Sequence, residues 1–167
     1  MTAAAPLRLL RTVRFDASDE RVYDKAAAPD EWAVSGAFAF AGLDPAQVAG
    51  KLRQAFANGF LGLASFGRST FAAVSEATPG DLAAAERALA EHLCSAHGAP
   101  DMEAALAAAR DEAAFVLDLC REAPVNTVFT VWRTWDAAGA IKEEFRTIRP
   151  PSGEPLHARI WTVVDEP

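Results

Sequence analysis

The sequence predicts an α+β fold: one domain over residues 1–167, an antiparallel or mixed sheet of about seven strands, and three main helices. Segments in which apolar residues alternate lie before residue 78 and again after residue 124. Between them lie two alanine-rich segments bounded by proline and glycine, which is typical of helices. Strands grouped apart from helices indicate α+β architecture, because a parallel sheet requires the two to alternate strictly.

Two strands and a helix are expected in the first part of the chain. Residues 7–15 alternate between apolar and polar side chains, as a half-buried strand does. Residues 31–40 predict a second strand with small side chains along one face, against which another element packs closely. Residues 43–59 predict a helix, since Asp44 suits its N-cap and Pro45 suits its first position.

The glycine-rich stretch NGFLGLASFGRSTF, residues 58–71, raises the question whether it binds a phosphate. Gly62 and Gly67 have the glycine spacing of a P-loop, but Arg68 stands where that motif needs lysine. A strand-like segment follows, whereas a P-loop is followed by a helix. We therefore predict two strands joined by a tight turn, with the Arg68 guanidinium as a candidate contact for a carboxylate or phosphate.

Two helices and a meander are expected in the rest of the chain. Residues 79–98 and 100–124 predict the helices, because they are rich in alanine and bounded by Pro and Gly. Three strand-like segments close the sequence, at residues 125–135, 140–150 and 156–165. Gly139 suits the left-handed position of the turn between the first two, so the segments predict a C-terminal three-stranded antiparallel meander.

The net charge of −7 argues against binding to nucleic acid or to anionic membranes. Residues 79–124 carry nine acidic and three basic side chains, a net charge of −6, so most of the acidity lies on the two helices. No run of about 18 apolar residues predicts a membrane span. Because Arg8, Arg11 and Arg14 interrupt the apolar start of the chain, we expect no signal peptide and a cytoplasmic protein.

Metal and nucleophile motifs are weak. His92, Cys94 and His97 are residue types that bind zinc, but a continuous helix directs His92 and Cys94 about 160° apart. No serine-nucleophile motif of the G-x-S-x-G type occurs. The sequence therefore predicts no metal site, no cofactor and no catalytic residue, and it leans away from an enzyme.

Four side chains are candidates for an anionic-ligand pocket on the sheet face: Arg68, Arg133, His157 and Arg159. His157 and Arg159 alternate on one face of the last predicted strand, and Arg133 belongs to the first strand of the meander. Guanidinium groups bind carboxylates and phosphates through paired hydrogen bonds. The competing interpretation is an amphipathic sheet face whose charged side chains lie in water.

The helix at 100–124 has a second apolar edge, formed by Phe115 and Leu119 beside Ala104 and Ala108. A helix with two apolar edges is either sandwiched between layers or offers one of them to a partner. Phe115 and Leu119 are therefore candidate interface residues, for a second copy of the chain or for another protein.

The runs RTVRFDASDERVYDKAAAPDEWAVSGAFAF and GKLRQAFANGFLGLASFGRST resemble an uncharacterised family of small bacterial, largely proteobacterial, proteins. The resemblance covers roughly residues 8–75. It implies no activity and no catalytic residue. It also implies an association with accessory genes of molybdoenzyme and cofactor-ligase systems, which favours an accessory role.

Three functions remain open at this stage. The favoured one is a non-catalytic cytoplasmic accessory or interaction protein, acting as a homo-oligomer or with a protein partner. The alternative is a small enzyme or small-molecule binder that uses the anionic-ligand pocket. Nucleic-acid binding through the aromatic and arginine-bearing meander is the least favoured, because the chain is acidic.

Overall fold

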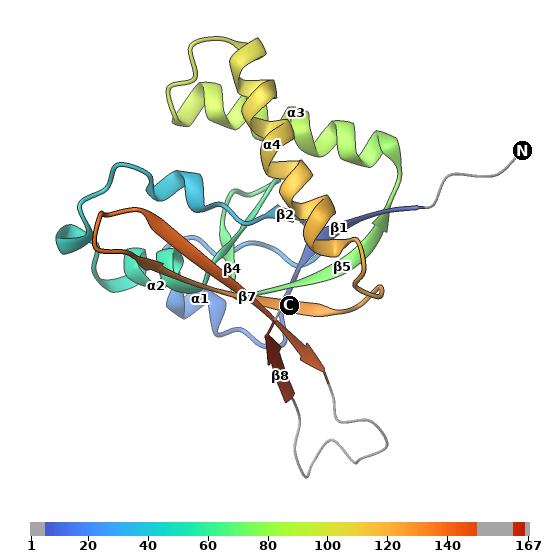
Figure 1. The fold of residues 1–167 in the computed structure, drawn as a ribbon, viewed down its shortest axis with the longest axis horizontal. Coiled ribbons are helices and arrows are strands. Elements are labelled where there is room, and N and C mark those ends of the chain that lie inside the picture. Colours follow the sequence, from blue (N-terminus) through green and yellow to red (C-terminus); the bar gives the residue numbers. More distant parts are fainter. Residues whose placement is uncertain (1–5, 150–161, 166–167) are drawn as a thin grey trace, which may run out of the picture.

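An antiparallel sheet of eight strands runs through the described part of the chain, in the order β4-β3-β2-β1-β5-β6-β7-β8 (Figure 1). The structure is a computed structural model and describes residues 6–149 and 162–165. Every neighbouring pair of strands is antiparallel. The α+β prediction is confirmed, with one strand more than the seven expected and with no parallel pair among the named strands.

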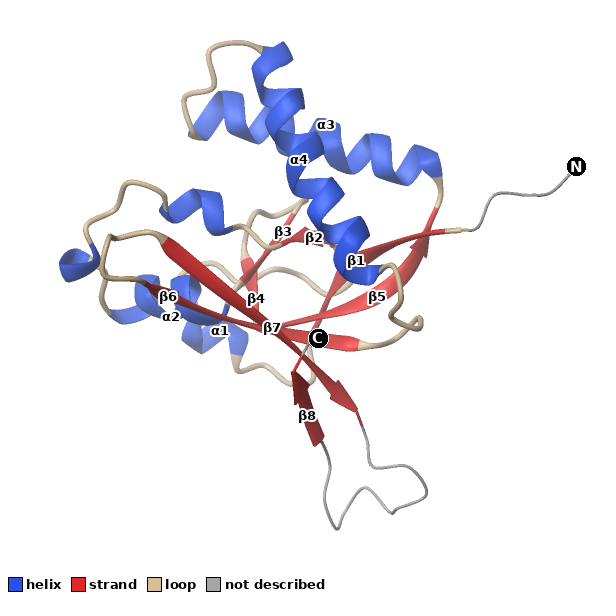
Figure 2. Cartoon of the chain, in the orientation of Figure 1, coloured by secondary structure: helices blue, strands red, loops and turns tan. Residues whose placement is uncertain are grey.

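The long strands form two pairs, β1 with β5 and β6 with β7, and the other strands are short (Figure 2). Their bounds are β1 Leu7–Val13, β2 Trp32–Val34, β3 Phe60–Gly62, β4 Arg68–Ser69, β5 Phe71–Ala77, β6 Val128–Trp135, β7 Ile141–Arg149 and β8 Thr162–Asp165. The helices are α1 Asp19–Val22, α2 Gly50–Asn58, α3 Pro79–Ala96 and α4 Met102–Cys120, with 3-10 helices η1 Ala37–Phe40 and η2 Pro45–Gln47. The predicted C-terminal meander is β6, β7 and β8, which pair in that order.

Three predicted elements differ in the structure. The two strands expected on either side of Gly67 are three, because β3 pairs with the short β4, whereas β5 pairs with β1 and β6. The strand expected over 31–40 ends at Val34, because Gly36 adopts φ +82° and the chain turns into η1. The helix expected over 43–59 is divided into η2 and α2, although Asp44 caps η2 through the amide of Ala46. Val48 is extended and buried between these helices, and it packs with Phe40 and Phe56 in a small core of its own.

The predicted helices α3 and α4 are confirmed, and both begin at side-chain caps. Thr78 and Asp81 form a reciprocal capping box at α3, and Asp101 accepts from the amide of Ala104 at α4. The two helices pack against each other and carry several buried alanines: Ala85, Ala90, Ala105, Ala109 and Ala113. None of the helices in residues 6–149 is both long and apolar enough to cross a membrane.

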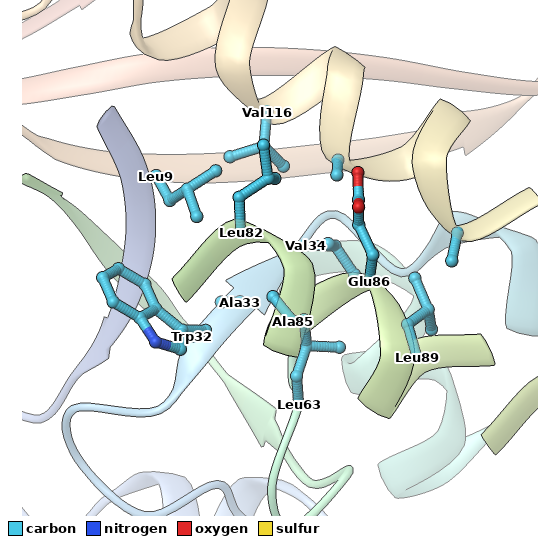
Figure 3. A pocket seen from close by; sticks show the side chains of 12 residues that line it. Leu9, Trp32, Ala33, Val34, Leu63, Leu82, Ala85, Glu86, Leu89 and Val116 are labelled. Atoms are coloured by element: carbon cyan, nitrogen blue, oxygen red, sulfur yellow. The ribbon is translucent and has the colours of Figure 1, made fainter. Parts of the chain in front are cut away.

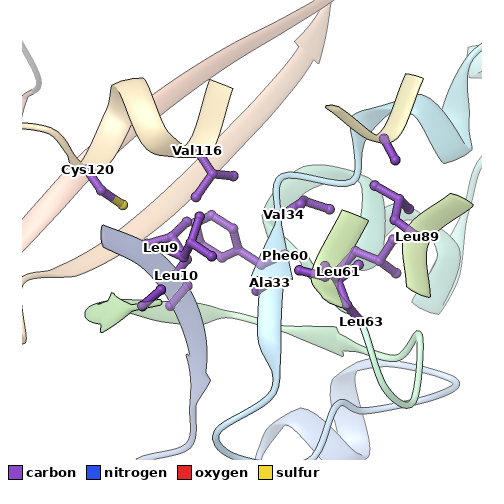
Figure 4. Packing of buried hydrophobic residues seen from close by; sticks show 14 of the residues in the cluster. Leu9, Leu10, Ala33, Val34, Phe60, Leu61, Leu63, Leu89, Val116 and Cys120 are labelled. Atoms are coloured by element: carbon purple, nitrogen blue, oxygen red, sulfur yellow. The ribbon is translucent and has the colours of Figure 1, made fainter. Parts of the chain in front are cut away.

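The sheet is curled, so that strands far apart in its order face one another. Phe60 of β3 and Phe145 of β7 lie 6.3 Å apart between ring centroids, although four strands separate β3 from β7 in the sheet. Val116 and Cys120 of α4 extend the same core toward β1 (Figure 4). The curled sheet and α4 therefore enclose a common apolar core.

The glycine-rich stretch binds a carboxylate of the protein itself. Glu31, only 7% exposed, accepts hydrogen bonds from the amides of Ala28, Ala64 and Ser65 and from the Ser65 hydroxyl. A side chain at Gly62 would collide with the Glu31 carboxylate. Gly62 thus lets the backbone approach Glu31 closely, and the structural interpretation of this stretch fits the geometry.

We predict that Gly67→Ala destabilises the fold, because a Cβ there would lie 2.6 Å from the carbonyl group of Ala26. Such overpacking costs about 1–3 kcal/mol of unfolding free energy. Gly80→Ala is the matched control, since its Cβ would meet its nearest neighbour, the Thr78 hydroxyl, at an ordinary 3.6 Å. Urea unfolding should show a neutral or slightly stabilising effect for the control, and equal losses in both variants would contradict the argument.

A second prediction concerns the Glu31 carboxylate. Burial raises its pKa, but hydrogen bonds from Ser65, Ala64 and Ala28 outweigh burial and bring the pKa below its ordinary value of 4.5. A lowered folded-state pKa gives stability that is present above pH 4.5 and is lost as the pH falls below it.

Glu31→Gln should therefore lose about 1–3 kcal/mol of unfolding free energy at pH 7, because the amide NH2 faces donors rather than acceptors. Its stability should also decline less than that of the unmodified protein between pH 5 and about pH 3. Exposed Glu76→Gln serves as the control in urea titrations at several pH values. An unchanged acid dependence in Glu31→Gln would remove this role for the carboxylate.

Candidate functional site

Arg133 of β6 is the largest fully buried side chain among the described residues, at 1% exposure. Its Nη1 donates to the carbonyls of Phe56, at 2.8 Å, and Gly59, at 2.9 Å. Its Nη2 donates to the carbonyl and to the hydroxyl of Ser35. Because Phe56 belongs to the last turn of α2, the guanidinium also satisfies carbonyls that a helix end leaves without amide partners.

Arg68 of β4 lies beside Arg133 and is 8% exposed. It donates to the Gly59 carbonyl, at 3.2 Å, and to the Gly36 carbonyl, at 3.3 Å. Both guanidiniums also lie near the ring of Phe40. The distance from Cζ to the ring centroid is 4.7 Å for Arg68 and 5.9 Å for Arg133. Burial, and then the charge of Arg133, lower the pKa of Arg68 to about 9, which leaves it charged at neutral pH.

Glu143 of β7 provides the carboxylate of this cluster. Its Oε2 accepts from Arg133 Nε at 2.8 Å and from the Ser35 hydroxyl. The Glu143 side chain is 22% exposed, so the ion pair reaches the surface beneath α4. Burial, and then the charge of Glu143, raise the pKa of Glu112 on α4.

A polar relay beside the arginines was missed by the sequence analysis. Tyr23 is 1% exposed and shares a 2.8 Å hydrogen bond with the Thr70 hydroxyl, which donates to buried Asp19 at 2.8 Å. Burial is the main cause that raises the pKa of Tyr23 to about 12. Tyr23 is the one tyrosine of the sequence, but its place in a polar, acidic segment gave no sign that it would be buried.

The predicted ligand residues are only partly brought together. Arg68 and Arg133 converge on the carbonyl of Gly59, and each guanidinium is bonded to backbone carbonyls. His157 and Arg159 lie outside the described residues. These hydrogen bonds connect η1, α2, β3 and β4 to the meander. The arrangement therefore has a structural role.

The candidate interface residues lie on the outer part of α4. Phe115 is 43% exposed, and its ring lies 5.3 Å from that of Phe145. Leu119 is partly buried against the main core. The second apolar edge is thus divided, with Leu119 turned toward the protein and much of Phe115 exposed to solvent.

His92 of α3 and His97, the residue after its end, form an aromatic cluster with two phenylalanines. The His92 ring stacks on Phe66 at 3.8 Å and lies 5.0 Å from His97, which in turn lies 5.2 Å from Phe38. The helix ends before His97, so the two imidazoles meet, which an uninterrupted helix would not allow. Among the described residues, no group of three His, Cys, Asp or Glu side chains is placed to hold a metal ion.

A small apolar cavity lies between the α3–α4 hairpin and the sheet (Figure 3). Its volume is about 10 Å³, and Leu9, Val34, Leu89 and Val116 are among its lining residues. A space of this size holds one water at most, and an apolar lining leaves such a space dry. It is a packing defect under the helices rather than a ligand pocket.

Residues 7–162 match a family of unknown function, DUF6505. The chain belongs to DUF6505. This confirms the resemblance to an uncharacterised family seen over residues 8–75, and extends it over nearly the whole chain. No curated protein and no solved structure matches the chain.

We predict that Arg133→Met severely destabilises this DUF6505 protein. The change removes the donor of the Ser35 and Phe56 carbonyls, and it leaves Gly59 with Arg68 alone and the Glu143 carboxylate with the Ser35 hydroxyl alone. Breaking a buried pair in this way costs about 3–5 kcal/mol of unfolding free energy.

Arg110→Met on the exposed surface of α4 is the matched control, with an expected change within about 0.5 kcal/mol. Chemical denaturation followed by circular dichroism measures both variants. If Arg133→Met proves too unstable to purify, Arg133→Lys supplies the comparison, because it keeps the charge but loses the planar set of donors. A loss below 1 kcal/mol in either Arg133 variant would refute the central role of this side chain.

Proposed function

We propose that this protein is a non-catalytic cytoplasmic accessory protein that binds another protein through the outer face of α4. The observation that carries the proposal is the 43% exposure of Phe115, a large aromatic side chain, on an otherwise acidic helix. The buried polar side chains of the candidate site are bonded to the protein's own backbone, so they favour a structural role over a catalytic one.

The proposed docking surface is a stripe of exposed residues on α4: Ala104, Ala108, Asp111, Phe115 and Asp118. These positions recur every three or four residues and so share one face of the helix. The alanines allow a partner to approach the helix closely, and Phe115 can anchor it. Aromatic side chains contribute much of the binding energy in protein interfaces.

Charge selects the kind of partner. Residues 79–124 carry a net charge of −6, and the stripe itself contains two aspartates and no basic residue. A second copy of the chain would bring two such acidic helices together, and like charges facing each other across an interface are unfavourable. The partner that fits is a protein with basic residues around an apolar pocket.

We predict that Phe115→Ser lowers retention of this partner at least tenfold, as loss of an interface hot spot does. Met102→Ser is the matched control, because Met102 is 37% exposed on the same helix but lies off the stripe. The measurement is affinity capture from the native host at two salt concentrations, with cross-linking to locate the contact on both proteins.

Support requires a bound protein with a basic contact surface, weaker capture at high salt, and loss of capture in Phe115→Ser alone. The proposal fails if capture is the same for both variants, or if the chain binds only a second copy of itself. It also fails if cross-links place the partner away from the stripe.

The alternative is a small enzyme or small-molecule binder with an anionic-ligand pocket on the sheet. It draws support from the convergence of Arg68 and Arg133, which places two positive charges beside one carboxylate. The hydrogen bonds of both guanidiniums to backbone carbonyls weigh against it, because a ligand would have to replace those bonds.

A further inference from the structure

We propose that the groove between the start of β1 and the end of α4 binds a small organic monocarboxylate with an apolar body. The groove has a volume of about 410 Å³, within the range of small-molecule sites. It is lined by Pro6, Leu7, Arg8, Leu117 and Arg121. It lies at the C-terminal end of α4 and meets the proposed docking stripe only at Asp118, which pairs with Arg121. The two proposals concern different ligands and are tested by different measurements.

One edge of the Arg8 guanidinium is unpaired among the described residues, and because its Nε is buried, a ligand must shift the side chain to reach both donors of that edge. The Nη1 of Arg8 donates to the carbonyls of Arg121, at 3.0 Å, and Ala123, at 3.3 Å, which fixes the group against the end of α4. Its Nε is buried and has no hydrogen-bond partner among the described residues. Nε and Nη2 form the side-on edge with which arginine binds both oxygens of a carboxylate.

The charge balance favours a monoanion. Arg121 pairs with Asp118 at 3.2 Å, and both side chains are largely exposed. Arg8 has no ion pair with a described carboxylate, so one positive charge in the groove is unbalanced. Asp118 and the last carbonyls of α4 oppose a dianion such as a phosphate monoester.

The remaining lining defines the rest of the ligand. Pro6, Leu7 and Leu117 provide apolar walls beside the two guanidiniums. A carboxylate on an aliphatic chain or an aromatic ring places its charge at Arg8 and its body against these walls. Such sites combine a mostly apolar lining with a few polar groups that fix orientation.

The test is titration of the full chain with octanoate and with phenylacetate, followed by calorimetry and by NMR shifts of the leucine methyl groups. Saturable binding of either acid with shifts at Leu7 and Leu117 is expected. Octanol, which lacks the charge, should bind at least tenfold more weakly, and octyl phosphate should bind no more tightly than octanoate.

Leu117→Trp fills the groove and should weaken binding at least tenfold, while Ala107→Trp, exposed elsewhere on α4, should not. Arg8→Lys keeps the positive charge but removes the side-on edge, and should weaken binding by a similar factor. Because Arg8 also holds the end of α4, Leu117→Trp decides the matter if Arg8→Lys does not fold.

Several results would overturn the proposal: no saturable binding of either acid, octanol binding as well as octanoate, octyl phosphate binding more tightly, or full binding by Leu117→Trp. None of them bears on capture of a protein through the stripe on α4.

Discussion

The fold depends on one buried guanidinium. Arg133 lies on a strand of the meander, yet its hydrogen bonds reach the residue after β2, the end of α2 and the residue before β3. Arginine is suited to this place because its planar group carries five donors and none of the acceptors that would compete with the carbonyls. Glu143 partly balances the charge, and Arg68 completes the contacts at Gly36 and Gly59.

Glu31 stabilises the backbone in the opposite way, as an acceptor of hydrogen bonds. Arg133 supplies donors to backbone carbonyls, and Glu31 supplies acceptors to backbone amides in the turn after β3. Both side chains allow short, irregular segments to be buried without leaving polar groups unpaired, which is the requirement that any buried loop must meet. The close approach of the Glu31 carboxylate explains why a glycine is needed at position 62, and the backbone of Ala26 and Ala27 explains the glycine at position 67.

The buried polar groups are used internally, and both surfaces proposed above for other molecules involve α4. Its outer face is acidic and carries one aromatic anchor, whereas the groove at its C-terminal end is lined by two arginines and apolar side chains. The groove takes Arg8 from β1 and Arg121 from the residue after α4, so its charge differs from that of the acidic outer face of the helix. The family has no known function, so membership of it neither favours nor opposes either proposal.

The local features of the sequence were sufficient to predict most of the elements. Alanine-rich segments bounded by proline and glycine predicted α3 and α4, and the alternation of side chains predicted β1 and the meander. Arg68 in place of lysine and the strand-like segment after it argued against a P-loop, and the structure has the strands β4 and β5 where that motif needs a helix.

The sequence by itself determined the α+β class, the helices and the main strands, because caps, turns and periodicity act over a few residues. Only the tertiary structure decided that Arg133 and Tyr23 are buried, that the helix before Gly59 is broken at Val48, and that His92 meets His97. The partners of Arg133 lie up to 98 residues away in the chain, and such contacts form only when the sheet curls.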